Sequence, residues 1–120
     1  MKESPVFIGD TLFTIYITET QEERKRGLMH INYLPPLYGM LFVFNHTDIV
    51  NMWMRNTRIP LDILFCDEVG KIVHIEKNTT PYSLESISSR YKVRYTIEIN
   101  GGTCDTYSIH VGQRFMFPFF

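Results

Sequence analysis

Residues 50–66 read VNMWMRNTRIPLDILFC, and this stretch decides the class of fold. Two runs rich in apolar residues, Val50–Arg55 and Ile59–Cys66, flank the turn-forming segment Asn56-Thr57-Arg58. Runs of about four to eight such residues, bounded by residues that favour turns, are typical of β-strands. The stretch therefore predicts two consecutive strands joined by a short turn.

The rest of the chain repeats this pattern at close spacing. Leu12–Thr18 alternates between apolar and polar residues, as a half-buried strand does, whereas Gly39–Asn45 is continuously apolar, as a strand buried on both faces is. The absence of alanine and the many Ile, Val, Thr, Tyr and Phe residues also favour β structure. Further strands are expected at Val6–Ile8, Lys71–Lys77, Tyr91–Ile99, Thr106–Ile109 and Gln113–Phe117.

One helix interrupts the strands. Thr20-Gln21-Glu22-Glu23 forms a capping box, with Thr at the cap and Glu three residues later, and predicts a short helix over Gln21–Met29. A length of 120 residues fits a single domain, residues 1–120. We expect a mainly β fold, a compact β sandwich or partly closed barrel, with one short helix between the first and second main strands.

Composition argues against several classes of function. The 12 basic and 13 acidic residues give a net charge of −1, so no bulk field attracts nucleic acid or an anionic membrane. No apolar run approaches the roughly 18 residues of a membrane span. The N-terminal sequence MKESPVFIGD lacks the apolar segment of a signal peptide, which favours a cytoplasmic location. The sequence does not indicate an oligomeric state.

Metal and cofactor motifs are absent from the sequence. The four histidines show no HxH, HxxxH or HExxH spacing, and two cysteines are too few for a four-cysteine zinc site. There is no glycine-rich phosphate loop. We therefore expect neither a metal nor a cofactor. Cys66 and Cys104 are either free thiols or, in an oxidising compartment, a disulfide.

Trp53 and Arg55 are the first candidate pair for a binding site. In a strand they share one face, while Met52 and Met54 take the opposite, core-facing side. A wide ring beside a planar cation can hold a carboxylate, a phosphate or a sugar. The same pair can instead stack on itself as a structural cation–π contact.

Two acidic residues are the candidates for catalysis. Asp62 lies in a strand that is apolar on both faces, so its carboxylate needs a cation or several N–H donors. The candidate cations are Arg26, Arg55 and Arg58. Glu98 belongs to a strand face that meets either solvent or a cleft. Asp62 is either a structural brace or a catalytic acid, and if it meets Glu98 the two could divide acid and base roles as in sugar hydrolysis.

The chain resembles a known family, domain of unknown function family 192, over about residues 13–115. The resemblance is carried by Arg26-Gly27-Leu28-Met29, Gly39-Met40-Leu41-Phe42-Val43-Phe44, Trp53-Met54-Arg55-Asn56-Thr57, Ile59-Pro60-Leu61-Asp62-Ile63-Leu64-Phe65, Asp67 with Gly70, and Ile97-Glu98 before Gly101. His30 and Ile31 stand where the family often has an aromatic residue and an arginine. The resemblance implies a compact β fold and no assigned reaction.

Residue chemistry and the resemblance point to the same set of candidate ligand-binding residues: Arg26, Trp53, Arg55, Asn56, Thr57, Asp62 and Glu98. Around one concavity they would suit a small polar or anionic ligand, and a binding module is the function we expect. Whether the chain is an enzyme stays open. One alternative is a hydrolase that uses Asp62 and Glu98. Another is a structural or interaction protein, in which the apolar Phe115–Phe120 tail packs on the core or meets a partner.

Overall fold

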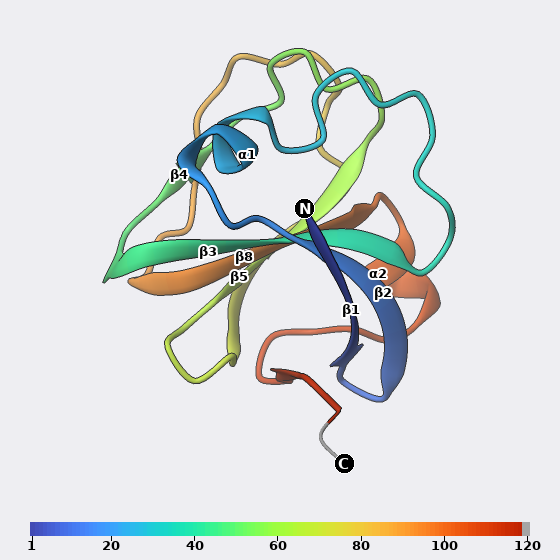
Figure 1. Ribbon diagram of the computed structural model, residues 1–120, viewed down its shortest axis with the longest axis vertical. Helices are drawn as coiled ribbons and strands as arrows, with labels where there is room; N and C mark the ends of the chain where they lie inside the picture. The colour runs from blue at the N-terminus through green and yellow to red at the C-terminus, as the bar shows by residue number, and fades with distance from the viewer. Residues whose placement is uncertain (119–120) are drawn as a thin grey trace.

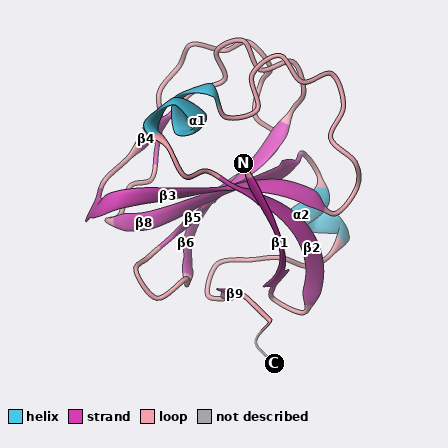
Figure 2. Ribbon diagram, in the orientation of Figure 1, coloured by secondary structure: helices cyan, strands magenta, loops and turns pink. Residues whose placement is uncertain are grey.

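The computed structural model describes residues 1–118 and shows a strongly curled β-sheet with one helix on its outer face (Figure 1). Strands dominate the secondary structure, as expected from the sequence (Figure 2). The elements are β1 (Lys2–Ile8), β2 (Thr11–Ile17), α1 (Gln21–Arg26), β3 (Tyr38–Asp48), β4 (Asn51–Met52), β5 (Leu61–Cys66), β6 (Ile72–Glu76), β7 (Ile87–Ser88), β8 (Val93–Asn100), α2 (Thr103–Thr106) and β9 (Phe115–Met116).

Seven strands form the main sheet, in the order β6-β5-β8-β3-β2-β1-β9. All neighbours are antiparallel except β2 and β3, which are parallel because α1 and its loops connect them. The sheet curls until its two ends meet: Lys71 bridges Arg114, and the Phe115 N–H donates to the Gly70 carbonyl at 3.0 Å. The expected mainly β, partly closed barrel is therefore confirmed. A second, two-stranded sheet joins β4 to β7.

The sheet is buried on both faces. One apolar cluster fills the inside of the curl and includes Ile15, Leu41 and Ile97. A second cluster, which includes Phe42 and Ile63, lies on the outer face, where the loops that follow α1 and β4 cover the sheet. This arrangement explains why β3 is buried on both faces near its start, as expected. It also explains why the strand that carries Asp62, β5, is apolar on both faces. Because α1 and β4 lie over β3 and β8, they also position the side chains of the candidate site (Figure 1).

The expected helix forms but is shorter than its sequence pattern. The Thr20 hydroxyl accepts from the Glu23 N–H at 3.1 Å, and the Glu23 carboxylate accepts from the Thr20 N–H at 3.0 Å, which completes the capping box. The helix ends at Arg26 rather than Met29 because Gly27 takes a positive φ of 51°. This turn presses Gly27 against the ring of Phe42, where an added Cβ would meet the ring at 3.2 Å.

Three expected strands are wrong in extent or type. Of the expected strand Val50–Arg55, only Asn51–Met52 is a strand. The Met54 N–H donates to the carbonyl of Ser83 in a distant loop, and the chain then turns. Thr106–Ile109 is not a strand: it begins with the last residue of the helical turn α2. The Ile109 N–H donates a hydrogen bond to the Cys104 carbonyl at 2.9 Å. Gln113–Phe117 contributes only the two residues of β9.

The C-terminal aromatic residues up to Phe117 pack on the protein. Phe115 is buried and meets Tyr95 edge-on at 5.1 Å between ring centroids, and Phe117 meets Phe115 at 6.2 Å. Phe119 and Phe120, the end of the expected apolar tail, lie outside the described residues. The structure therefore favours the packed alternative for the part of the tail that it describes.

Candidate functional site

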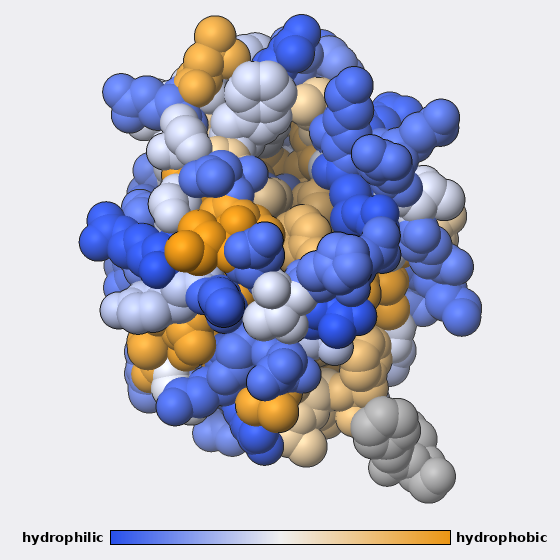
Figure 3. Space-filling model, turned by 90° about the vertical axis from the view of Figure 1, so that its left-hand side faces the viewer, coloured by the Kyte–Doolittle hydropathy of each residue, from blue (hydrophilic) through white to orange (hydrophobic). Residues whose placement is uncertain are grey.

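A pocket of about 340 Å³ lies on the outer face of the sheet, between α1 and the segment that runs from β4 to Trp53. Its floor comes from β3 and β8, which supply Phe42 and Glu98, and its far wall includes Met52. Apolar side chains gather in a central depression on the side of the molecule that carries β4, and hydrophilic side chains border it (Figure 3). The pocket therefore combines an apolar interior with a polar rim, as ligand sites usually do.

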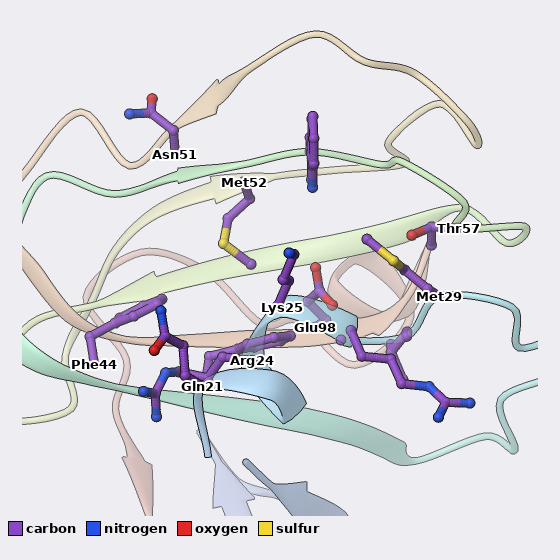
Figure 4. Close-up of a pocket in the computed structure, with 14 residues that line it drawn as sticks. Gln21, Arg24, Lys25, Met29, Phe44, Asn51, Met52, Thr57 and Glu98 are labelled. Atoms are coloured by element: carbon purple, nitrogen blue, oxygen red, sulfur yellow. The ribbon is translucent and has the colours of Figure 1, made fainter. Parts of the chain in front are cut away.

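Glu98 is the one acid of the pocket lining, and it is 4% exposed. Within residues 1–118 no hydrogen bond or ion pair reaches its carboxyl group, which keeps contact with the pocket space: the fully buried side-chain atom without a partner in this range is Thr96 Oγ1. Its cross-strand neighbours, Met40 and Ile63, are apolar. Burial alone raises the pKa of Glu98 to about 8, so the neutral acid predominates at pH 7. Figure 4 shows the carboxyl group directed from the sheet into the space between α1 and the opposite wall.

Three consecutive cations of α1, Arg24, Lys25 and Arg26, border the same pocket. Basic residues in the last turn complement the helix dipole, which is a structural reason for their presence. In the part of the chain that the structure describes, none of the three forms an ion pair with an acidic side chain. The cations also do not contribute to the pKa of Glu98. Among the described residues, the rim therefore presents three cations that have no ion-pair partner.

Trp53 forms part of the wall opposite the helix and is 45% exposed. The Arg55 guanidinium lies over its ring, with the carbon atom 5.3 Å from the ring centroid. Arg55 itself does not line the pocket, so of the two expected roles this pair shows the structural cation–π contact. Met54 is fully buried, as expected, but Met52 is only half-buried because it faces the pocket.

Asn56 and Thr57 form the turn that ends this wall. Asn56 takes a positive φ of 54°, and its carbonyl accepts from the His30 N–H at 2.9 Å, which ties the wall to the loop after α1. The buried Thr57 lines the pocket, but its hydroxyl donates to the Arg55 carbonyl at 3.1 Å. Asn56 does not reach the pocket.

Asp62 is fully buried and is a structural brace rather than part of the pocket. Of the two expected kinds of partner, a cation or several N–H donors, the structure shows the second: backbone N–H groups satisfy the carboxylate. The donors are Asn78 at 2.9 Å, Gly102 at 3.2 Å and Cys104 at 2.9 Å. The brace joins the loop after β6 and the start of α2 to β5.

The two candidate acids point to opposite faces of the sheet. Asp62 pairs with Ile99 across β5 and β8, whereas Glu98 pairs with Ile63. Paired residues of adjacent strands share a face and consecutive residues alternate, so the carboxylates of Asp62 and Glu98 diverge. The alternative in which Asp62 and Glu98 share acid and base roles in a hydrolase is therefore wrong.

Of the seven candidate residues, the pocket brings together Arg26, Trp53, Thr57 and Glu98. Sequence analysis did not select Arg24 and Lys25 as site residues, although these cations directly precede the motif Arg26-Gly27-Leu28-Met29 that carries the resemblance. Met29 and Phe44, which contribute apolar lining, also belong to quoted motifs, but their residue types gave no reason to place them in a site.

Metal-ligating groups and cysteine thiols were the other candidates for chemistry among residues 1–118. No group of three or more His, Cys, Asp or Glu side chains in this range could hold a metal ion. Cys66 and Cys104 are free and buried. Burial and the adjacent Asp62 carboxylate raise the pKa of the Cys104 thiol to about 12, and burial also raises the pKa of Cys66. These thiols are therefore protonated and poor nucleophiles at neutral pH. No helix within this range is long and apolar enough to cross a membrane.

Comparison with solved structures gives two close matches. A protein from Sinorhizobium meliloti 1021, described as a "putative transcription regulator", is 35% identical with a TM-score of 0.93, and the match covers 97% of this chain and 94% of that one. A protein of unknown function from Novosphingobium aromaticivorans DSM 12444 is 31% identical with a TM-score of 0.91, over 96% and 85% of the two chains. No functionally curated protein matches the chain. The model of family DUF192, described as Uncharacterized ACR, matches residues 6–117, and the chain therefore belongs to this family.

Proposed function

We propose that this domain is a binding module for a small polar or anionic ligand, and that the ligand occupies the pocket between α1 and Trp53. The observation that carries the proposal is the carboxyl group of Glu98, which is buried at the pocket floor without a partner. A buried polar group without a partner costs free energy of folding, and such costs persist mainly where function requires them. A ligand that bonds to Glu98 would remove this cost.

The charge of the rim supports an anionic group on the ligand. Arg24, Lys25 and Arg26 face the pocket without acidic partners among the described residues. Glu98 adds little negative charge at pH 7 because its pKa is about 8. The lining therefore carries an excess of positive charge, which attracts anions.

A titration of the whole protein tests the proposal. Sulfate, benzoate and glucose would be added separately to ¹⁵N-labelled protein, and amide shifts followed at pH 6.5. We expect saturable shifts of Gly27, Trp53 and Glu98 with at least one anion. The double variant R24M/K25M should weaken that binding by about tenfold or more, because charged hydrogen bonds contribute about 1.5–3 kcal/mol.

The matched control is Lys92→Met, since Lys92 is exposed, as Lys25 is, and lines none of the pockets around α1. This variant should bind the anion as the wild type does. Equal weakening by both variants would show that binding is non-specific. Absence of saturable binding with every probe would overturn the proposal and favour the structural or interaction protein.

The regulator description of the Sinorhizobium meliloti protein is compatible with a module that senses a small molecule. This chain offers no second observation for nucleic acid, because its net charge is −1. We therefore propose ligand binding alone.

A further inference from the structure

The pocket floor and the pocket rim make different demands on a ligand, and together they define its chemical class. The rim offers the cations of α1, whereas the floor offers the single carboxyl group of Glu98. Between them the lining is apolar, with Phe42, Phe44 and Met52. An inorganic ion could satisfy only one end of this arrangement.

The size of the pocket limits the ligand further. A volume of about 340 Å³ corresponds to roughly ten water molecules at about 30 Å³ each. It is also at the lower end of the range for sites that enclose small organic molecules, about 300–1,000 Å³. A ligand with a single ring and two substituents fits this space.

We propose that the pocket takes a monocyclic organic anion, with its acid group at the α1 cations of the rim and a hydrogen-bond acceptor deeper in the pocket, beside Gly27, that binds the protonated Glu98 carboxyl. This inference rests on the proposed function, since it names the class of ligand for the same site. The ring lies against the apolar lining and beside the Trp53 indole. The acceptor is a carbonyl, ether or hydroxyl oxygen, and it becomes the missing partner of Glu98.

The protonation state of Glu98 follows from its surroundings. The charged groups of α1 that face the pocket are Arg24, Lys25 and Arg26, and the strands beside Glu98 present the apolar Met40 and Ile63. β4 and the wall after it contribute no titratable group to the lining. The charge at the pocket floor therefore depends on the protonation of Glu98. Its pKa of about 8 keeps it a hydrogen-bond donor at pH 6.5 and makes it an acceptor at pH 9.5.

Two probes of similar size separate the floor contact from the rest of the site. 4-Acetylbenzoate carries a carbonyl acceptor opposite its carboxylate, and 4-isopropylbenzoate has a methyl group in place of the carbonyl oxygen. At pH 6.5 we expect the wild type to prefer 4-acetylbenzoate by about five- to tenfold in Kd, the ratio that one hydrogen bond supplies. At pH 9.5 this preference should disappear.

Variants of Glu98 provide the decisive control. Glu98→Gln keeps an N–H donor at every pH, so its preference for 4-acetylbenzoate should persist at pH 9.5. Glu98→Leu removes the donor and should bind both probes with similar Kd at both pH values. Circular dichroism of each variant would confirm that it is folded before the comparison is made.

The outcomes distinguish this inference from the proposed function. If both probes bind with the same Kd in the wild type at pH 6.5, or if the preference survives in Glu98→Leu, the floor contact is wrong while the binding module stands. If neither benzoate binds but sulfate does, the ligand class is wrong and an anion site remains. If no probe binds at all, the proposed function itself fails.

Discussion

The substitution Glu98→Gln should stabilise the folded protein at neutral pH, and the gain should depend on pH. The pKa of Glu98 is about 8 in the folded protein against 4.5 for the unperturbed group. Because the folded state holds the proton more tightly, the wild type is most stable below pH 4.5 with respect to this group. It loses that stability as the pH rises toward 8, where the folded protein also releases the proton.

The magnitude follows from the difference between the two pKa values. At about 1.4 kcal/mol per pH unit, the separation of roughly 3.5 units corresponds to about 5 kcal/mol above pH 8. At pH 7 the loss is about 3 kcal/mol, because the pH is then about 2.5 units above the unfolded pKa. Glutamine keeps the shape of the protonated acid and does not ionise. The stability difference between Glu98→Gln and the wild type should therefore rise from near zero at pH 4 to about 3 kcal/mol at pH 7.

Urea unfolding followed by circular dichroism between pH 4 and pH 9 measures this difference. Glu68→Gln is the matched control, since Glu68 is exposed in the turn between β5 and β6 and should give a difference close to zero throughout. A flat difference curve for Glu98→Gln, or a variant that is less stable than the wild type at pH 7, would refute the reasoning. Either result would mean that the folded protein holds Glu98 as a stabilised carboxylate.

Two further substitutions test the frame of the site. Asp62→Ala should lower the free energy of unfolding by about 3 kcal/mol or more, because it leaves three buried backbone N–H groups without an acceptor. A loss below about 1 kcal/mol in urea unfolding would contradict the role of Asp62 as a brace. Gly39→Ala should cost about 1–3 kcal/mol, because the new Cβ would lie 2.6 Å from the Glu98 carbonyl oxygen and 2.7 Å from an Ile99 methyl carbon. An unchanged Tm for this variant would show that β3 and β8 are less closely packed than the structure indicates.

The strands that could be predicted from the sequence are those whose side-chain pattern is set by burial on the sheet. β2, β3 and β5 each present apolar residues to one or both clusters, and their patterns carry that information along the chain. The segment after β4 could not be predicted in the same way. Its alternation resembles a strand, but Met54 is held by a loop that lies about thirty residues further along the chain. Local periodicity carries no record of such a contact.

The candidate site was predictable in its residue types and only partly in its arrangement. Burial of Asp62 follows from the apolar residues on both sides of it, but its partners are backbone groups of residues 78, 102 and 104, which carry no side-chain signal. Backbone donors are invisible in a sequence, so the sequence could not decide between an arginine and several N–H groups as the partner of Asp62. The pocket likewise depends on how closely α1 approaches β3, which is set by the conformation of Gly27.

The two buried acids show how a brace and a site can be distinguished on physical grounds. Asp62 and Glu98 lie on adjacent strands, and both are almost completely shielded from solvent. Asp62 receives three N–H donors from within the chain, so its negative charge is satisfied and no ligand is required. Glu98 receives none and borders a pocket with unpaired cations. The hydrogen-bonding capacity of Asp62 is therefore used within the chain, whereas that of Glu98 is left for a group that enters the pocket.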